Sequence, residues 1–150
     1  MTWRTTLFHL WFRIQRPMTL GVRVLAFDAQ GALLLVRHTY VPGWHLCGGG
    51  VETGDTFEQT LAKELEEEAN VELGDDVTLQ SLHFNRAVSK RDHVAVYVAK
   101  GVVQRAPKRA DREIAEARFF ALDALPEGTT ISTLKRLEEY QSGTKPDPYW

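Results

Sequence analysis

Residues Gly49–Val71 read GGVETGDTFEQTLAKELEEEANV, a glycine-rich loop that runs into a helix loaded with carboxylates. From Glu52 to Asp76 the chain has ten acids and one base, Lys63, which is half of its 20 acids in a protein of net charge −2. Like charges four residues apart destabilise an isolated helix by about 0.2–0.5 kcal/mol. A bound divalent cation would reverse the sign of that effect. The segment therefore predicts a metal site.

Helical geometry predicts which of these acids converge. At about 100° per residue, Glu67 and Glu68 project on either side of Glu64, within an arc of roughly 100°. Glu66 points some 160° away from Glu64 and should face water. An apolar stripe of period four, which would dock the helix, borders the three carboxylates and consists of Phe57, Leu61, Leu65 and Ala69.

The same stretch resembles the Nudix box, G-x5-E-x7-R-E-U-x-E-E-x-G-U, where U is aliphatic. The matching positions are Gly49, Glu64, Leu65, Glu67, Glu68 and Val71. Residues 43–52, GWHLCGGGVE, are similar to the usual approach to the box, G-W-x-L-P-G-G-x-x-E. The resemblance implies a single-domain α/β fold, a Nudix-type α/β/α sandwich on a mixed β-sheet.

Four positions depart from the family pattern. Asp55 stands at the first Glu position and Lys63 at the Arg position, both supports of the catalytic carboxylates in the family. Lys cannot form the bidentate fork that Arg forms, so this support is expected to be looser. Asn70 replaces the late Gly, a mild change at a left-handed helix cap. Cys47 replaces Pro and is expected to be a packed thiol.

The resemblance implies a hydrolase that cleaves the pyrophosphate bond of a nucleoside diphosphate linked to another group. Mg²⁺, or Mn²⁺, is the implied cofactor, since both prefer oxygen ligands. Glu67 and Glu68 are the first candidate ligands, with the Gly49 carbonyl as a backbone ligand. Glu64 is a candidate ligand, general base, or both. Glu67 also counts among the candidate catalytic residues, and Glu52 is expected to order the loop.

Residues outside the box complete the candidate site. The family often recruits a further acid from a distant loop, and Glu113 is the best candidate, with Asp111 and Glu116 behind it. Candidate substrate-binding residues, each of which could equally be an ordinary strand or core residue, are Arg23, Arg37 and Trp44.

Length and composition fit one compact unit. At 150 residues, 43% hydrophobic and 25% charged, the chain is typical of a globular domain. A single cysteine excludes an internal disulfide and is consistent with a cytoplasmic protein. We expect a helix over residues 1–17, a Nudix domain over 18–141 and a tail over 142–150. The small-molecule nucleotide is the expected partner, and the acidic helix argues against duplex nucleic acid.

Alternation predicts strands at residues 21–28, 32–38, 77–88, 93–103 and 117–121, and a short strand before the glycines. Helices are expected at 56–69 and 130–141, the second with Ile131, Leu134 and Leu137 facing inward. The first of these begins with a capping box on either Asp55–Glu58 or Thr56–Gln59.

The first 16 residues predict a basic amphipathic helix. Apolar residues at helical spacing are Trp3, Leu7, Leu10, Trp11 and Ile14, interleaved with Arg4, Arg13 and Arg16. No run approaches the ~20 apolar residues of a transmembrane span. We expect the helix to pack on its own domain or on a partner subunit, which would give a homodimer; a membrane surface is the alternative.

The sequence does not identify the substrate. Marks of several Nudix subfamilies are missing downstream of the box; for example, no Pro lies between Val71 and Pro107. A non-catalytic Nudix domain that binds a nucleotide as sensor or scaffold is the alternative function. Glu67 and Glu68 argue against it, whereas Asp55 and Lys63 keep it open.

Overall fold

The computed structural model describes residues 2–150 and contains one central sheet. Its strands are β1 (Thr19–Phe27), β2 (Leu33–His38), β3 (Cys47–Gly50), β5 (Val77–Phe84), β6 (Asp92–Lys100) and β8 (Ile114–Phe120). The order is β5-β6-β1-β2-β8, with β3 paired to β1. β1 runs parallel to β6 and antiparallel to β2 and β3, so the sheet is mixed.

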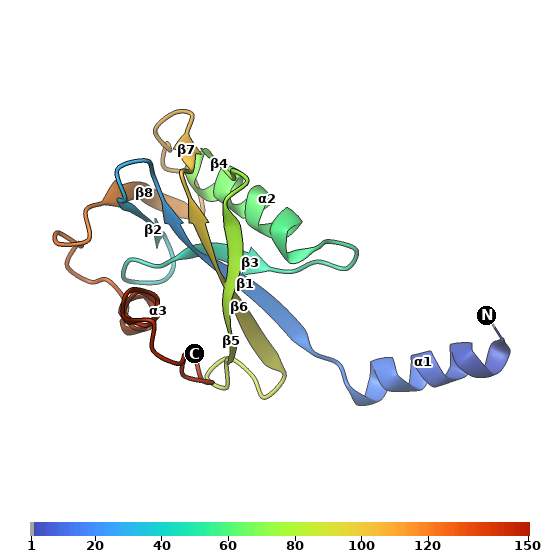
Figure 1. Ribbon diagram of the computed structural model, residues 1–150. Helices are drawn as coiled ribbons and strands as arrows, with labels where there is room; N and C mark the ends of the chain where they lie inside the picture. Colours follow the sequence, from blue (N-terminus) through green and yellow to red (C-terminus); the bar gives the residue numbers. More distant parts are fainter. Residues whose placement is uncertain (1) are drawn as a thin grey trace.

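Two helices cover opposite faces of this sheet (Figure 1). The alternating side chains of β1 show the two layers: Val22 and Val24 pack with α2 (Phe57–Ala69), while Leu25 and Phe27 pack on the side of α3 (Ile131–Ser142). Strand residues alternate between faces, so one strand serves both cores. The α/β/α sandwich expected from the sequence is confirmed.

Both ends of α2 are fixed by local hydrogen bonds. Thr56 is the N-cap, and it forms a reciprocal capping box with Gln59. The alternative box on Asp55 and Glu58 was wrong. At the other end Asn70 adopts the left-handed conformation at φ 55°, as expected for its place in the box.

The inward face of α3 differs from expectation. Leu137 is buried, but Ile131 is 81% exposed and Leu134 44% exposed. Arg136 lies inside instead, donating to Glu139 at 2.9 Å and lying 2.7 Å from Nδ1 of His83 on β5. An Arg is buried only where such partners meet it, and the apolar pattern of α3 does not reveal them.

The remaining elements extend the domain at its edges. A two-stranded sheet of β4 (Val71–Glu72) and β7 (Val103–Gln104), not expected from the sequence, follows α2. Residues 142–150 return to the edge of β5, where the Trp150 amide donates to the Phe84 carbonyl. This segment therefore packs against the sheet.

Helix α1 (Trp3–Gln15) projects from the N-terminal end of β1, away from the sheet and from α2 and α3 (Figure 1). Within residues 2–150, none of its side chains is buried, so it does not pack on its own domain as the sequence had suggested. No helix in this part of the chain is long and apolar enough to cross a membrane.

Candidate active site

The carboxylates of α2 open onto two adjoining cavities. One, of about 370 Å³, lies between α2 and the ends of β1, β2 and β3, and is lined by Glu64, Glu68, Glu113, Arg23 and Gly49 among others. The other, of about 330 Å³, adds Glu67, Asp111 and Arg112. Glu64, Glu68 and Glu113 line both cavities. Three acids of α2 and one from the distant loop thus line the same pair of adjoining cavities.

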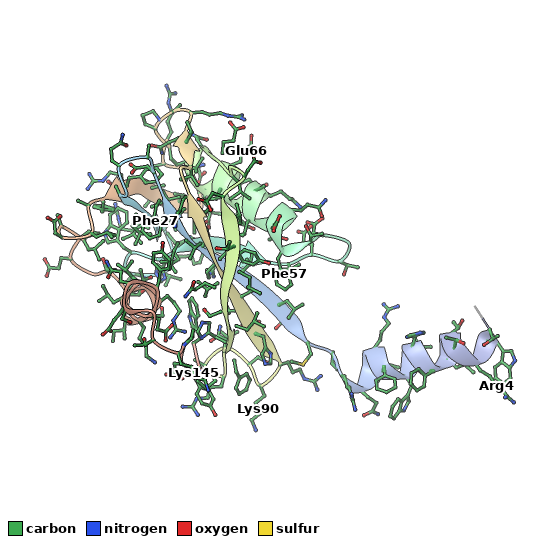
Figure 2. The ribbon with its side chains drawn as sticks, viewed as in Figure 1. Arg4, Phe27, Phe57, Glu66, Lys90 and Lys145 are labelled. Carbon is green, nitrogen blue, oxygen red and sulfur yellow. The ribbon has the colours of Figure 1, made fainter. Side chains whose placement is uncertain are left out.

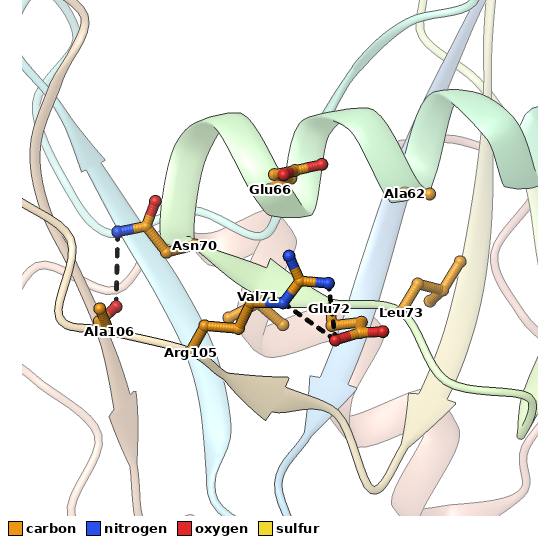
Figure 3. Close-up of a pocket in the computed structure, with 8 residues that line it drawn as sticks. All are labelled: Ala62, Glu66, Asn70, Val71, Glu72, Leu73, Arg105 and Ala106. Atoms are coloured by element: carbon orange, nitrogen blue, oxygen red, sulfur yellow. Dashed lines mark hydrogen bonds and ion pairs between the residues drawn. The ribbon is translucent and has the colours of Figure 1, made fainter.

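Glu66 lies on the opposite side of α2. It lines a separate cavity formed with β4 and the residues that follow β7, beside Asn70 and the ion pair between Arg105 and Glu72 (Figure 3). The arrangement agrees with the helical phase expected from the sequence, in which Glu66 faces away from Glu64. Neighbouring glutamates in the sequence therefore face different surroundings.

Glu68 is the most enclosed of these acids, at 9% exposure. Its Oε2 accepts from the Gly48 amide at 3.2 Å, and its Oε1 lies 3.9 Å from Nε2 of His38. Burial raises the pKa of Glu68, although contacts with the Cys47 thiol and the Gly48 amide oppose the rise. Cys47 is itself buried, and burial raises the pKa of its thiol, so it is an unreactive packed thiol.

Glu64 lies directly over the glycine loop. A Cβ on Gly49 would collide with the Glu64 carboxylate, and a Cβ on Gly48 would collide with the Val22 carbonyl oxygen. Burial, followed by the charges of Glu68 and Glu67, raises the pKa of Glu64. The two glycines therefore allow a carboxylate and the backbone to share a space that side chains would fill.

The residues fit a hard divalent cation in their chemistry. The cavities gather carboxylate oxygens, which are the ligands that such a cation prefers, and Gly49 leaves backbone accessible beside them. Burial raises the pKa values of Glu64 and Glu68, and the charges of neighbouring glutamates add to the rise. Across residues 2–150, however, no three His, Cys, Asp or Glu side chains are already drawn together as a metal-binding group. Binding a cation would therefore require the carboxylates to close in on it.

The two altered supports pair with each other. Lys63 Nζ lies 3.0 Å from Asp55 and 3.6 Å from Glu52, and these contacts raise the pKa of Lys63. They connect the loop before α2 to the helix itself. Lys63 acts on Glu64 only through its charge, which opposes the rise in the pKa of Glu64.

The three candidate substrate residues separate in the structure. Arg23 on β1 lines the larger cavity. Arg37 points elsewhere, pairing with Glu116 at 3.1 Å, with its guanidinium 5.6 Å from the centre of the Trp44 ring. Trp44 is 8% exposed and packs in the core on the α3 side, so it is a core residue and is not brought to the cavities.

Among the loop acids, Glu113 is the one that faces both cavities. Asp111 orders the loop: its carboxylate accepts from the amides of Glu113 and Ile114 and pairs with Lys108 at 2.7 Å. Glu116 is occupied by Arg37 and by Arg118. The geometry therefore favours Glu113 over the two other candidates.

Three ring-bearing residues that line the larger cavity were not found from the sequence. His38, Tyr40 and His45 flank the larger cavity, and the His38 ring lies 5.3 Å from that of Tyr40 and 5.6 Å from that of His45. Burial lowers the pKa of His38, with His45 and Arg23 adding to the effect. The sequence signal that could have indicated them is their position at the end of β2 and in the loop that follows it.

The NUDIX domain family matches residues 17–140. A MutT NUDIX hydrolase from Burkholderia pseudomallei is 27% identical, with a TM-score of 0.67 over 80% of this chain and 95% of that one. An ADP-ribose pyrophosphatase from Streptococcus suis is 22% identical, with a TM-score of 0.61 over 85% and 93%. A UDP-X diphosphatase is 20% identical, with a TM-score of 0.58 over 95% and 73%. No curated protein sequence matches the chain.

Proposed function

The chain belongs to the NUDIX family, and on that premise we propose that it is a metal-dependent hydrolase of the pyrophosphate bond in a nucleoside diphosphate linked to another group. The observation that carries this is the convergence of Glu64, Glu67, Glu68 and Glu113 on adjoining cavities beside the glycine loop. Family members generally use a divalent ion such as Mg²⁺ or Mn²⁺.

Each residue has a proposed role. Glu67, Glu68 and the Gly49 carbonyl hold the metal, and Glu64 is either a third ligand or the base that takes the proton from the attacking water. In the metal-free protein burial raises the pKa of Glu64, which is the direction that suits a general base. A bound metal would neutralise diphosphate charge and acidify water. Glu113 is the second candidate base.

The substrate is proposed to extend from the carboxylates across β1. A further cavity of about 250 Å³ is lined by Arg23, Gly49, Asn85 and Trp150. Arg23 and Gly49 line both this cavity and the larger one with the carboxylates. Arg23 is therefore placed to contact a phosphate between them, leaving the neighbouring cavity for the nucleoside or the attached group.

A substrate panel tests this function. The names of structural relatives suggest ADP-ribose and UDP-linked compounds, and nucleoside triphosphates should be included. Released phosphate or pyrophosphate is measured with Mg²⁺, with Mn²⁺ and with excess chelator. Metal-dependent release from at least one compound supports the proposal. Tight nucleotide binding with no hydrolysis of any compound would support the sensor alternative instead.

A further inference from the structure

Helix α1 presents an unpartnered apolar face to solvent. At about 100° per residue, five of its side chains fall within an arc of roughly 100°. They are 51–69% exposed: Trp3, Leu7, Leu10, Trp11 and Ile14. Phe8, 58% exposed, widens the face. An exposed apolar surface of this kind, on a helix that buries none of its side chains within residues 2–150, indicates a binding surface.

The charges on and around α1 have one sign. The first 27 residues contain four arginines and no acid, whereas the whole chain has net charge −2. At the same 100° per residue, Arg13 lies about 60° beyond one edge of the apolar arc and Arg4 about 20° beyond the other. Arg16 follows the helix as its C-cap. The partner that matches such a helix is negatively charged as well as apolar. A second copy of α1 carries arginines and no acid, so pairing two copies would bring like charges together.

The end of the domain next to α1 also carries basic and exposed apolar side chains. Arg91, in the turn between β5 and β6, donates to the Pro17 carbonyl at 3.3 Å, and its own carbonyl accepts from the Thr19 amide at 3.0 Å. Lys90 lies in the same turn (Figure 2). Val88 is 73% exposed and Met18 51% exposed. Basic and apolar side chains thus extend from α1 onto the domain.

We propose that α1 is an interfacial helix that lies flat on an anionic lipid surface and holds the domain there. Its 13 residues span only about 20 Å, too short to cross a bilayer. Its apolar arc would enter the acyl boundary, with Trp3 and Trp11 at the depth where indole rings prefer to lie. The arginines would remain at the headgroups, where long side chains keep their charge in water.

The test uses the full chain with vesicles of phosphatidylcholine, either alone or mixed with phosphatidylglycerol. Sedimentation with the anionic vesicles is expected, with little on neutral ones, and added salt should weaken it. Tryptophan emission should shift to the blue as Trp3 and Trp11 leave water, and replacing both by Phe should remove the shift.

Charge-reversal variants separate α1 from overall charge. The test variant is Arg4→Glu, Arg13→Glu, Arg16→Glu. Its partitioning should weaken about a hundredfold or more, because each base near an anionic surface contributes separately. The control variant makes the same charge change at exposed positions elsewhere: Lys100→Glu, Arg109→Glu, Lys145→Glu. It should bind at least about tenfold more tightly than the test variant.

Folding does not confound this comparison, because α1 buries no side chain and the three control positions are exposed. Both variants should therefore unfold at the wild-type temperature. Equal weakening in both variants would overturn the proposal, as would a failure of the wild type to bind anionic vesicles. A dimer that dissociates on Leu7→Glu and Trp11→Glu, without vesicle binding, would assign the surface to a second copy. Each result can be read without knowing the substrate.

Discussion

Replacing Glu68 by Gln should stabilise the metal-free protein and remove its stabilisation by metal. Glu68 is 9% exposed and stands four residues from Glu64, so two like charges share one half-buried helix face. Burial raises the pKa of Glu68, which means that the fold disfavours its ionised form. A Gln has the same shape, and its amide oxygen can still accept from Gly48.

The expected magnitudes follow from these contacts. Relief of one like-charge pair four residues apart stabilises by about 0.2–0.5 kcal/mol, or roughly 0.4–2 °C in Tm for a domain of this size. A ligand at a hundred times its Kd stabilises the wild type by about 2.7 kcal/mol, or roughly 5–10 °C. The variant should therefore unfold slightly later than wild type in chelator and clearly earlier in saturating metal.

The assay is thermal unfolding in chelator and over a titration of MgCl₂ or MnCl₂. Glu66→Gln is the matched control, since Glu66 lies on the far side of α2 beside Arg105. It should keep the full metal-dependent rise. A Glu68→Gln protein that is destabilised without metal, or that still gains as much from metal as wild type, would refute the reasoning.

Further predictions concern the supports of the site and the core. Lys63→Arg and Asp55→Glu should together raise kcat/KM by more than the product of the single effects, because the two side chains are 3.0 Å apart; strict multiplication would show them to be independent. Burial lowers the pKa of His83, so the unfolded chain takes up a proton at higher pH than the folded protein does. The stabilisation from neutral His83 should therefore be complete above about pH 6.5 and decrease as the pH falls below that value. In urea unfolding, the stability of His83→Asn should depend less on pH than that of the wild type. Gly48→Ala should cost about 1–3 kcal/mol or more, because its Cβ meets backbone, whereas Gly50→Ala, with nothing within 4 Å, should be nearly neutral in the same assay.

The features found from the sequence are those set by local periodicity. The span of α2, its capping box on Thr56 and the opposite orientation of Glu66 all follow from residues within a few turns of each other. The sandwich itself followed from the match to the box and the order of elements. These are short-range regularities, and the structure reproduces them.

The features that were missed depend on contacts between distant segments. Arg136 is buried where His83, more than 50 residues away in the sequence, meets it, whereas Ile131 lies on the exposed side of α3. His38 reaches the cavity because β2 ends beside α2. Trp44 could not be assigned to the core or to a pocket until the sheet placed it against Phe120.

The measurement that most directly tests the central claim is the hydrolysis rate of Glu67→Gln beside that of Glu66→Gln, on the best substrate of the panel, with saturating metal. The two residues are adjacent in sequence and both exposed, but only Glu67 lines the cavity with Glu64 and Glu113. The account predicts that Glu67→Gln loses at least about a hundredfold in kcat, because a metal ligand supports several kcal/mol of transition-state stabilisation, while Glu66→Gln stays close to wild type. Equal losses in the two variants would contradict it.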